Sequence, residues 1–134
     1  MTDTEVRDVV RQIRKCARRV YRELGPGYAE AVYQKAMGIE LQLRGIQYVT
    51  ERNVEVVYRK RYSIGVKRID LFVLDGIAVE LKRLTGLGEK EMRQAALQAK
   101  AANALSVLVN FPDVPDASVD VCVDGRPYKK WAKR

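Results

Sequence analysis

Hydrophobic residues recur at the spacing of an amphipathic helix in the first third of the chain. Residues 3–24 carry apolar positions three or four apart and stop at Gly25-Pro26-Gly27, which predicts one long helix. Residues 28–44 predict a second helix with Gly45 as its C-cap. We expect its buried stripe to consist of Val32, Ala36, Ile39 and Leu43.

The pattern then changes to the alternation that is typical of strands, interrupted once by an alanine-rich helix. Strands are expected at residues 47–58, 62–74, 77–84, 106–111 and 118–123, with a basic turn at 59–61 and the helix at 89–103. Antiparallel strands come first, followed by a helical crossover to a further strand. The order α-α-β-β-β-α-β-β predicts the α/β class, with a mixed sheet flanked by helices.

Two of these strands meet at Asp75-Gly76 and form a hairpin with strict alternation. One face would be apolar and consist of Ile69, Leu71, Val73, Ile77, Val79 and Leu81. The opposite face, expected to be exposed, carries Asp70, Glu80 and Lys82. Two carboxylates beside a lysine suit a divalent-metal site and phosphoryl chemistry. The alternative is an ordinary solvated strand face, on which these residue types are common.

The length of the turn decides whether the two carboxylates meet. A two-residue loop at Asp75-Gly76 would pair Asp70 with Leu81 and send the acids to opposite faces. A three-residue loop over residues 74–76 pairs Asp70 with Glu80 and keeps all six apolar residues on one side, so we expect this register. Such a loop would be a type I turn followed by Gly76 in the left-handed region of a G1 bulge.

Composition describes one globular domain, residues 1–134, with 47% hydrophobic and 31% charged residues. No apolar run approaches the roughly 18–20 residues that cross a bilayer, and no signal peptide is apparent at the start. We therefore expect a cytoplasmic protein without a membrane partner. Cys16 and Cys122 fall in a predicted helix and strand and are expected to be reduced, buried thiols.

The net charge of +8 favours a polyanionic partner, above all nucleic acid, although solubility alone would also explain it. The basic tail, about residues 125–134, mixes cations with aromatic residues that could grip phosphates and stack on a base, or it could be a solvated terminus. The candidate nucleic-acid contacts are Arg68, Lys100, Lys129, Lys130 and Trp131.

Several kinds of catalytic site are excluded by residues that the chain lacks. It contains no histidine, so Ser-His and Cys-His pairs and histidine general bases are ruled out. Neither glycine-rich nucleotide-binding motif is present, and two isolated cysteines cannot form a zinc knuckle. Enzymatic chemistry would therefore depend on carboxylates, lysines and a bound metal.

Several short motifs resemble one known family. Gly27-Tyr-Ala-Glu30-Ala-Val-Tyr33 resembles the signature of the GxxExxY family, a branch of the PD-(D/E)XK nuclease superfamily. The resemblance covers residues 6–111 in order and spacing, through Leu24-Gly-Pro-Gly27, Ile39-Glu-Leu41, Arg44-Gly-Ile46, Ile69-Asp70, Val79-Glu-Leu-Lys82, Gln94 and Val109-Asn-Phe111. Each motif alone is weak, but their shared order makes the match strong.

This resemblance implies a restriction-endonuclease-like core of helix, three antiparallel strands, helix and strand, with the metal site on the central hairpin. Asp70 and Glu80 match the metal-ligating carboxylates, and Lys82 matches the lysine near the attacking water. Glu30 matches a helix-borne glutamate that completes or supports the metal site, and Gln94 matches a glutamine beside the lysine.

The chain departs from the family pattern at two positions. Relatives usually carry an aromatic residue four positions after the glutamine, where this chain has Gln98. An i, i+4 pair shares one helix face, so Gln98 can point at the site but cannot stack or act as a phenol. Ile69 replaces the proline that nominally precedes the aspartate.

The sequence as a whole predicts a Mg²⁺- or Mn²⁺-dependent deoxyribonuclease. Three alternatives stay open: an inactive nucleic-acid-binding module of the same fold, a Holliday-junction-type resolvase acting as a homodimer, and a protein whose target is RNA rather than DNA.

Overall fold

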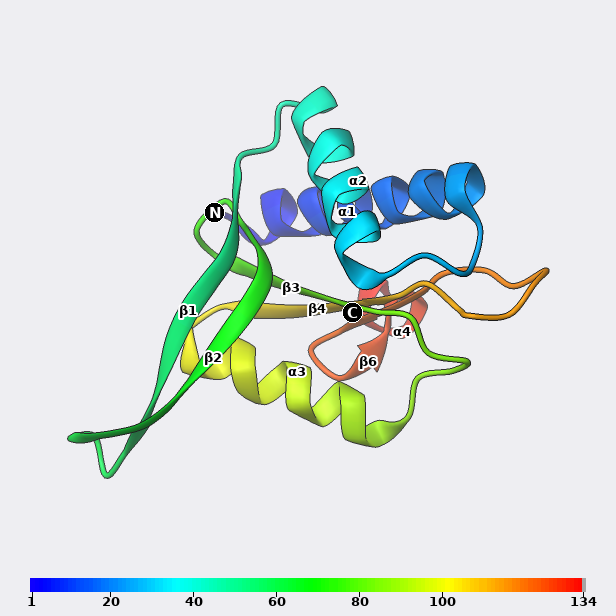
Figure 1. Cartoon of the computed structure of the whole chain (residues 1–134). Coiled ribbons are helices and arrows are strands. Elements are labelled where there is room, and N and C mark those ends of the chain that lie inside the picture. Colours follow the sequence, from blue (N-terminus) through cyan, green and yellow to red (C-terminus); the bar gives the residue numbers. More distant parts are fainter. Residues whose placement is uncertain (134) are drawn as a thin grey trace.

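The computed structural model describes residues 1–133 and places one β-sheet between two layers of helices (Figure 1). The elements follow in the order α1 (Asp3–Leu24), α2 (Glu30–Leu43), β1 (Tyr48–Tyr58), β2 (Tyr62–Val73), β3 (Ile77–Lys82), α3 (Glu89–Ala101), β4 (Leu105–Asn110), β5 (Asp120–Val123), β6 (Arg126–Pro127) and α4 (Tyr128–Ala132). The predicted order is confirmed as far as β5. The short β6 and α4 were not predicted, and Arg134, the last residue of the basic tail, lies outside the described residues.

The six strands found in residues 1–133 form one sheet whose spatial order follows the sequence. Pairing is antiparallel from β1 to β3, parallel between β3 and β4, and antiparallel again from β4 to β6. The parallel step needs a crossover connection, which α3 provides. The predicted mixed α/β sheet is therefore confirmed.

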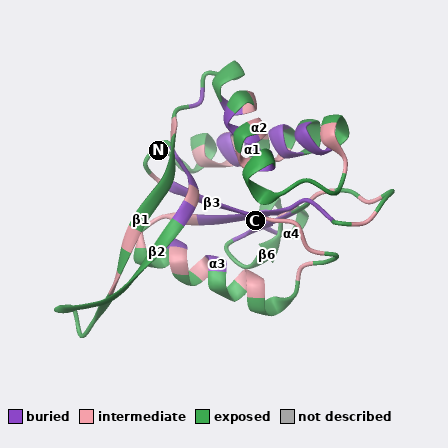
Figure 2. Ribbon diagram, in the orientation of Figure 1, coloured by how far each residue is buried: buried purple, intermediate pink, exposed green. Residues whose placement is uncertain are grey.

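The centre of the sheet, formed by β3, β4 and the end of β2, is buried on both faces (Figure 2). On one face, apolar residues of β2, β3 and β4 join those of α1 and α2 in the largest cluster of buried side chains. On the other face, Ala95 and Ala99 of α3 contribute to two smaller clusters. The prediction that the hairpin face of Asp70, Glu80 and Lys82 is exposed is wrong, because α3 packs over Phe72 and Ala78 on that face and Glu80 is buried.

Helix α1 has the predicted bounds because local signals mark both ends. Thr2 is the N-cap, and its hydroxyl accepts the backbone N–H of Glu5 at 3.1 Å. Gly25, at φ 68°, ends the helix in a conformation that favours glycine. No helix within residues 1–133 is both long enough and apolar enough to cross a membrane.

Helix α2 buries a different stripe from the one predicted. Tyr33, Met37 and Leu41 are buried, whereas Val32, Ile39 and Leu43 are exposed. Both sets have helical spacing, so periodicity alone could not choose between them. Tyr33 decides the orientation, because its ring stacks on Phe111 with the centroids 4.5 Å apart.

Candidate active site

The register of the β2–β3 hairpin brings the two predicted carboxylates to opposite positions. Leu71 pairs with Val79, and Val73 pairs with Ile77, across a three-residue loop. Continuing this register by one residue sets Asp70 against Glu80. The predicted three-residue loop is therefore confirmed, and the paired residues end one position before Asp70 and Glu80.

The conformation of the turn differs from the prediction. Leu74 and Asp75 have positive φ values of 49° and 54°, and Gly76 does not have one. The Gly76 N–H donates to the carbonyl of Val73 at 3.1 Å. This is the pattern of a type I′ turn, whose twist matches that of the flanking strands. The predicted type I turn with Gly76 in the left-handed region is wrong.

Asp70 lies where β2 and β3 separate. The paired residues of the two strands end at Leu71 and Val79, and beyond them Asp70 Oδ2 accepts the backbone N–H of Leu81 at 2.8 Å. The carboxylate thus replaces a backbone acceptor and is held between the strands. Ile69 packs with the cluster under α3 rather than with Leu71, which corrects the predicted six-residue apolar face.

Strand β1 is irregular at Glu51, close to Asp70. The residues on either side of Glu51, Thr50 and Arg52, pair with Leu71 and Ile69, and the φ of Glu51 is 55°. A left-handed residue in a strand bends the local ladder. We attribute the switch of Ile69 to the α3 side to this bend.

Glu80 is the most strongly perturbed acid of the site. Its side chain is 9% exposed, and its Oε1 is fully buried without a hydrogen-bond partner among the described residues. Burial, followed by the charge and hydrogen bonding of the neighbouring Asp70 carboxylate, raises the pKa of Glu80 to about 8, although the charge of Lys82 acts to lower it. The three residues therefore form one electrostatic unit, as the hairpin pattern predicts.

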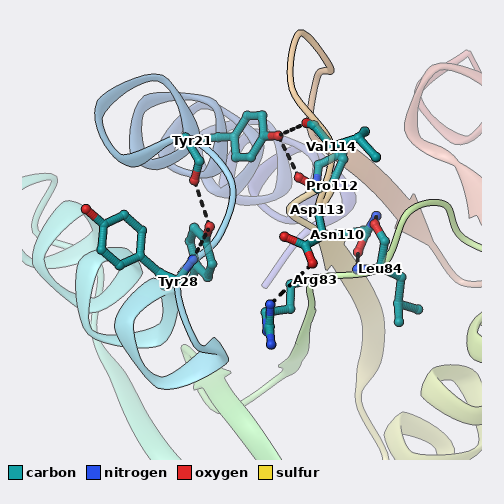
Figure 3. Close-up of polar contacts among 10 residues, drawn as sticks. Tyr21, Tyr28, Arg83, Leu84, Asn110, Pro112, Asp113 and Val114 are labelled. Carbon is teal, nitrogen blue, oxygen red and sulfur yellow. Dashed lines mark hydrogen bonds and ion pairs between the residues drawn. The ribbon is translucent and has the colours of Figure 1, made fainter.

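The end of β3 is fixed by a buried amide. Asn110 of β4 accepts the Leu84 N–H at 2.7 Å and donates to the Leu84 carbonyl at 3.1 Å (Figure 3). The Phe111 N–H donates to the carbonyl of Lys82 at 2.8 Å. These bonds hold the backbone of Lys82 and of the residues that follow it. The sequence indicated Asn110 only through the family resemblance and gave it no role.

A second set of contacts holds the loop after β4 in place. The Tyr21 hydroxyl donates to the carbonyls of Pro112 and Val114, at 2.6 and 3.1 Å, and Arg83 pairs with Asp113 at 3.5 Å (Figure 3). The chain segment that follows Lys82 is thereby tied to both β4 and α1.

Glu30 does not join the acidic pair in a three-acid group. Among residues 1–133, no three Asp, Glu, Cys or His side chains gather closely enough to bind one metal ion. Glu30 is exposed in the first turn of α2, where a carboxylate favours the helix dipole, and α2 packs on the sheet face opposite α3. Its predicted role as a third ligand is not supported. Tyr33, from the same motif, donates to the Gly25 carbonyl at 2.7 Å and so stabilises the loop before α2.

The two glutamines of α3 have different surroundings. Gln94, the predicted site residue, is exposed. Gln98 is half-buried, and its Oε1 is fully buried without a hydrogen-bond partner among the described residues. Gln98 precedes Ala99, which packs on Phe72 and Ala78. The amide directed into the protein is therefore that of Gln98, the residue at which the chain departs from the family pattern.

The predicted nucleic-acid contacts divide into exposed cations and one buried ring. Arg68, Lys100, Lys129 and Lys130 are exposed. Trp131 is only 8% exposed and belongs to the main core, with the Arg7 guanidinium 5.1 Å from its ring centroid. The expectation that Trp131 stacks on a base is wrong, because α4 folds the tail back onto the sheet and covers the ring.

The donor set suits a hard divalent cation. Asp70 and Glu80 offer carboxylate oxygens, and Glu80 Oε1, which has no partner within residues 1–133, is a buried acceptor that a cation would satisfy. Mg²⁺ commonly takes one or two carboxylates and keeps several waters, so two acids are sufficient. The residues present therefore fit a Mg²⁺ or Mn²⁺ ion.

Comparison with known proteins agrees with this fold. The model of a family described as the PD-(D/E)XK nuclease superfamily matches residues 7–121. No curated protein and no solved structure matches the chain. The chain belongs to the PD-(D/E)XK nuclease superfamily, which supports a nuclease-type function and agrees with the restriction-endonuclease-like fold. Membership of the GxxExxY branch stays a prediction.

Proposed function

We propose that the protein is a nuclease that depends on Mg²⁺ or Mn²⁺ and hydrolyses phosphodiester bonds in DNA. One observation carries the proposal: the half-buried Asp70 lies beside the buried Glu80, whose Oε1 lacks a partner among residues 1–133, and Lys82 lies close enough to affect the ionisation of Glu80. A buried carboxylate beside a second acid is costly unless a cation balances the charge.

Asp70 and Glu80 would hold the ion, and Lys82 would act beside it. The ion, when bound, supplies a water of lowered pKa and neutralises charge on the phosphate. The bond from the Leu81 N–H to Asp70 keeps that carboxylate oriented. The Lys82 ammonium orients the water or stabilises the negative charge that develops during hydrolysis. Helix α3 covers this face and limits the access of bulk water.

Cleavage assays test this function directly. Wild-type protein would be incubated with Mn²⁺ and plasmid, linear, single-stranded or branched DNA, with RNA as a parallel substrate. We expect DNA cleavage by the wild type and a loss of at least about a hundredfold in Asp70→Asn. Asp75→Asn is the matched control, because Asp75 is an exposed acid on the same hairpin. Failure of the wild type to cleave any DNA would refute the proposal, as would an Asp70→Asn variant as active as wild type.

A further inference from the structure

The β1–β2 hairpin continues well beyond the part of the sheet that the helices cover. Its distal half projects away from the body of the molecule at the lower left of Figure 1. Residues 57–68 are all exposed, and this half is green in Figure 2. We call residues 53–68 the arm. Residues 57–68 contribute nothing buried to the core, so the length of the arm is not explained by packing.

The arm carries exposed aromatic and apolar side chains. Tyr58 pairs directly with Tyr62, so the two rings share a face, and they are 58% and 53% exposed. Ile64 and Val66 follow on β2 and are also exposed, but the register shift between Val56 and Val57 breaks the alternation there and puts Val66 on the opposite face from Tyr62. Exposed apolar side chains gathered in this way on a projecting element indicate a binding partner.

The charge of the arm selects the class of partner. It carries five cations, Arg59, Lys60, Arg61, Lys67 and Arg68, against the single acid Glu55. Arms of two copies would repel each other at this charge, whereas a phosphate backbone would be attracted. Charge complementarity therefore favours nucleic acid over a second copy of the chain.

The turn at the tip displays its cations in an unfavourable conformation. Arg59 and Lys60 have φ values of 53° and 57°, and the Arg61 N–H donates to the Tyr58 carbonyl at 3.2 Å. Asn and Gly are the favoured residues in such a type I′ turn. Two long cations stand there instead, although each left-handed non-glycine residue costs stability.

The arm has a defined reach from the acidic pair. Tyr62 lies eight residues from Asp70 along β2, or about 26 Å at about 3.3 Å per residue. This distance corresponds to about eight nucleotides at the 3.4 Å spacing of one strand.

We propose that the arm is a nucleic-acid-binding element of the nuclease. Its cations contact phosphates about eight nucleotides from the bond that is cut, and Tyr58 and Tyr62 stack on unpaired bases there. The inference rests on the proposed function for the place of cleavage, but the binding itself does not require cleavage.

Fluorescence anisotropy with chelator present tests the binding without catalysis. The probes are a 30-nucleotide single strand and the matching duplex. The arm variant Arg59→Asn/Lys60→Gly/Arg61→Gln removes three charges and places the favoured Asn-Gly pair in the turn, so the fold is preserved. The control Lys15→Gln/Arg18→Gln/Arg22→Gln removes three exposed charges from α1.

We expect the arm variant to bind both probes at least about tenfold more weakly than wild type, with the logarithmic salt dependence smaller by about 2. The control should change affinity less than the arm variant does. Tyr58→Ser/Tyr62→Ser should weaken single-strand binding more than duplex binding. An arm variant that binds as tightly as the control variant would overturn the proposal. The proposal would also be overturned if light scattering showed that Tyr58→Ser/Tyr62→Ser converts a dimer to monomers while nucleic-acid binding stays unchanged.

Cleavage assays on the same variants separate this inference from the proposed function. The substrates extend more than about eight nucleotides beyond the cut. If the wild type cleaves them and the arm variant cleaves them equally well, the proposal for the arm is refuted and the proposed nuclease function stands. If the wild type cleaves no substrate but its nucleic-acid binding depends on the arm, the proposed nuclease function is refuted and the proposal for the arm stands.

Discussion

Glu80 shows how a single residue can link the chemistry of the site to the stability of the fold. Its carboxyl has an ordinary pKa of 4.5 and a pKa of about 8 in the folded protein, chiefly because it is buried. Between these values the folded state binds a proton that the unfolded chain releases. The stabilisation is therefore complete below pH 4.5 and is lost as the pH rises through about 8.

This linkage predicts the pH dependence of stability. In chelator, the free energy of unfolding of the wild type should fall by up to about 1.4 kcal/mol per pH unit over this range. Glu80→Gln should remove most of that dependence, because its amide stays neutral. Urea denaturation at several pH values measures the free energy of unfolding of both proteins. If this free energy changes with pH in the same way for the wild type and Glu80→Gln from pH 5 to 8, the account is contradicted.

Asn110 holds the chain just after Lys82 through its two hydrogen bonds to the Leu84 backbone. Asn110→Ala leaves the Leu84 N–H and carbonyl without their buried partners, so we expect a loss of about 1–3 kcal/mol in the free energy of unfolding. Asn53→Ala, at an exposed position, is the control and should change stability by less than about 0.5 kcal/mol. Equal urea midpoints for the two variants would show that the Asn110 bonds contribute nothing.

At the scale of elements, the outcome of each prediction depended on whether the local pattern had one solution. Helix α1 has one apolar stripe and a cap at each end, so its bounds followed from the sequence. Helix α2 has two apolar stripes, and only the stacking of Tyr33 on Phe111 selects between them. The hairpin register followed from alternation, but the turn conformation did not, because loop length does not determine φ.

The turn between β2 and β3 gives an element-scale test of this correction. Leu74 occupies a left-handed position that Asn tolerates better. Leu74→Asn should therefore raise the free energy of unfolding by about 0.5–1 kcal/mol. Leu97→Asn, at an exposed position within α3, should lower it by about 0.5 kcal/mol because Asn is a poorer helix former. Thermal unfolding of both variants would show whether the two changes in the free energy of unfolding have opposite signs. Destabilisation by Leu74→Asn would contradict the type I′ assignment.

At the scale of the whole molecule, the sheet decides which predicted residues meet. Asp70, Glu80 and Lys82 lie together because a hairpin fixes their spacing locally, and their shared role in a site stays a prediction. The positions of Glu30, Gln98 and Trp131 depend on how helices pack on the sheet, and no local pattern carries that information. The five-residue helix α4 is also too short to show a period, so the burial of Trp131 could not be foreseen.

Binding of Mn²⁺ tests the central claim most directly. Isothermal titration calorimetry at pH 8 would compare wild type with Asp70→Asn and Glu80→Gln, and with Asp75→Asn as the control. We expect one Mn²⁺ site in the wild type and the control, and a loss of at least about tenfold in affinity in each of the other two variants. Wild-type protein that takes up no Mn²⁺, or variants at Asp70 and Glu80 that bind it as tightly as wild type, would contradict the account.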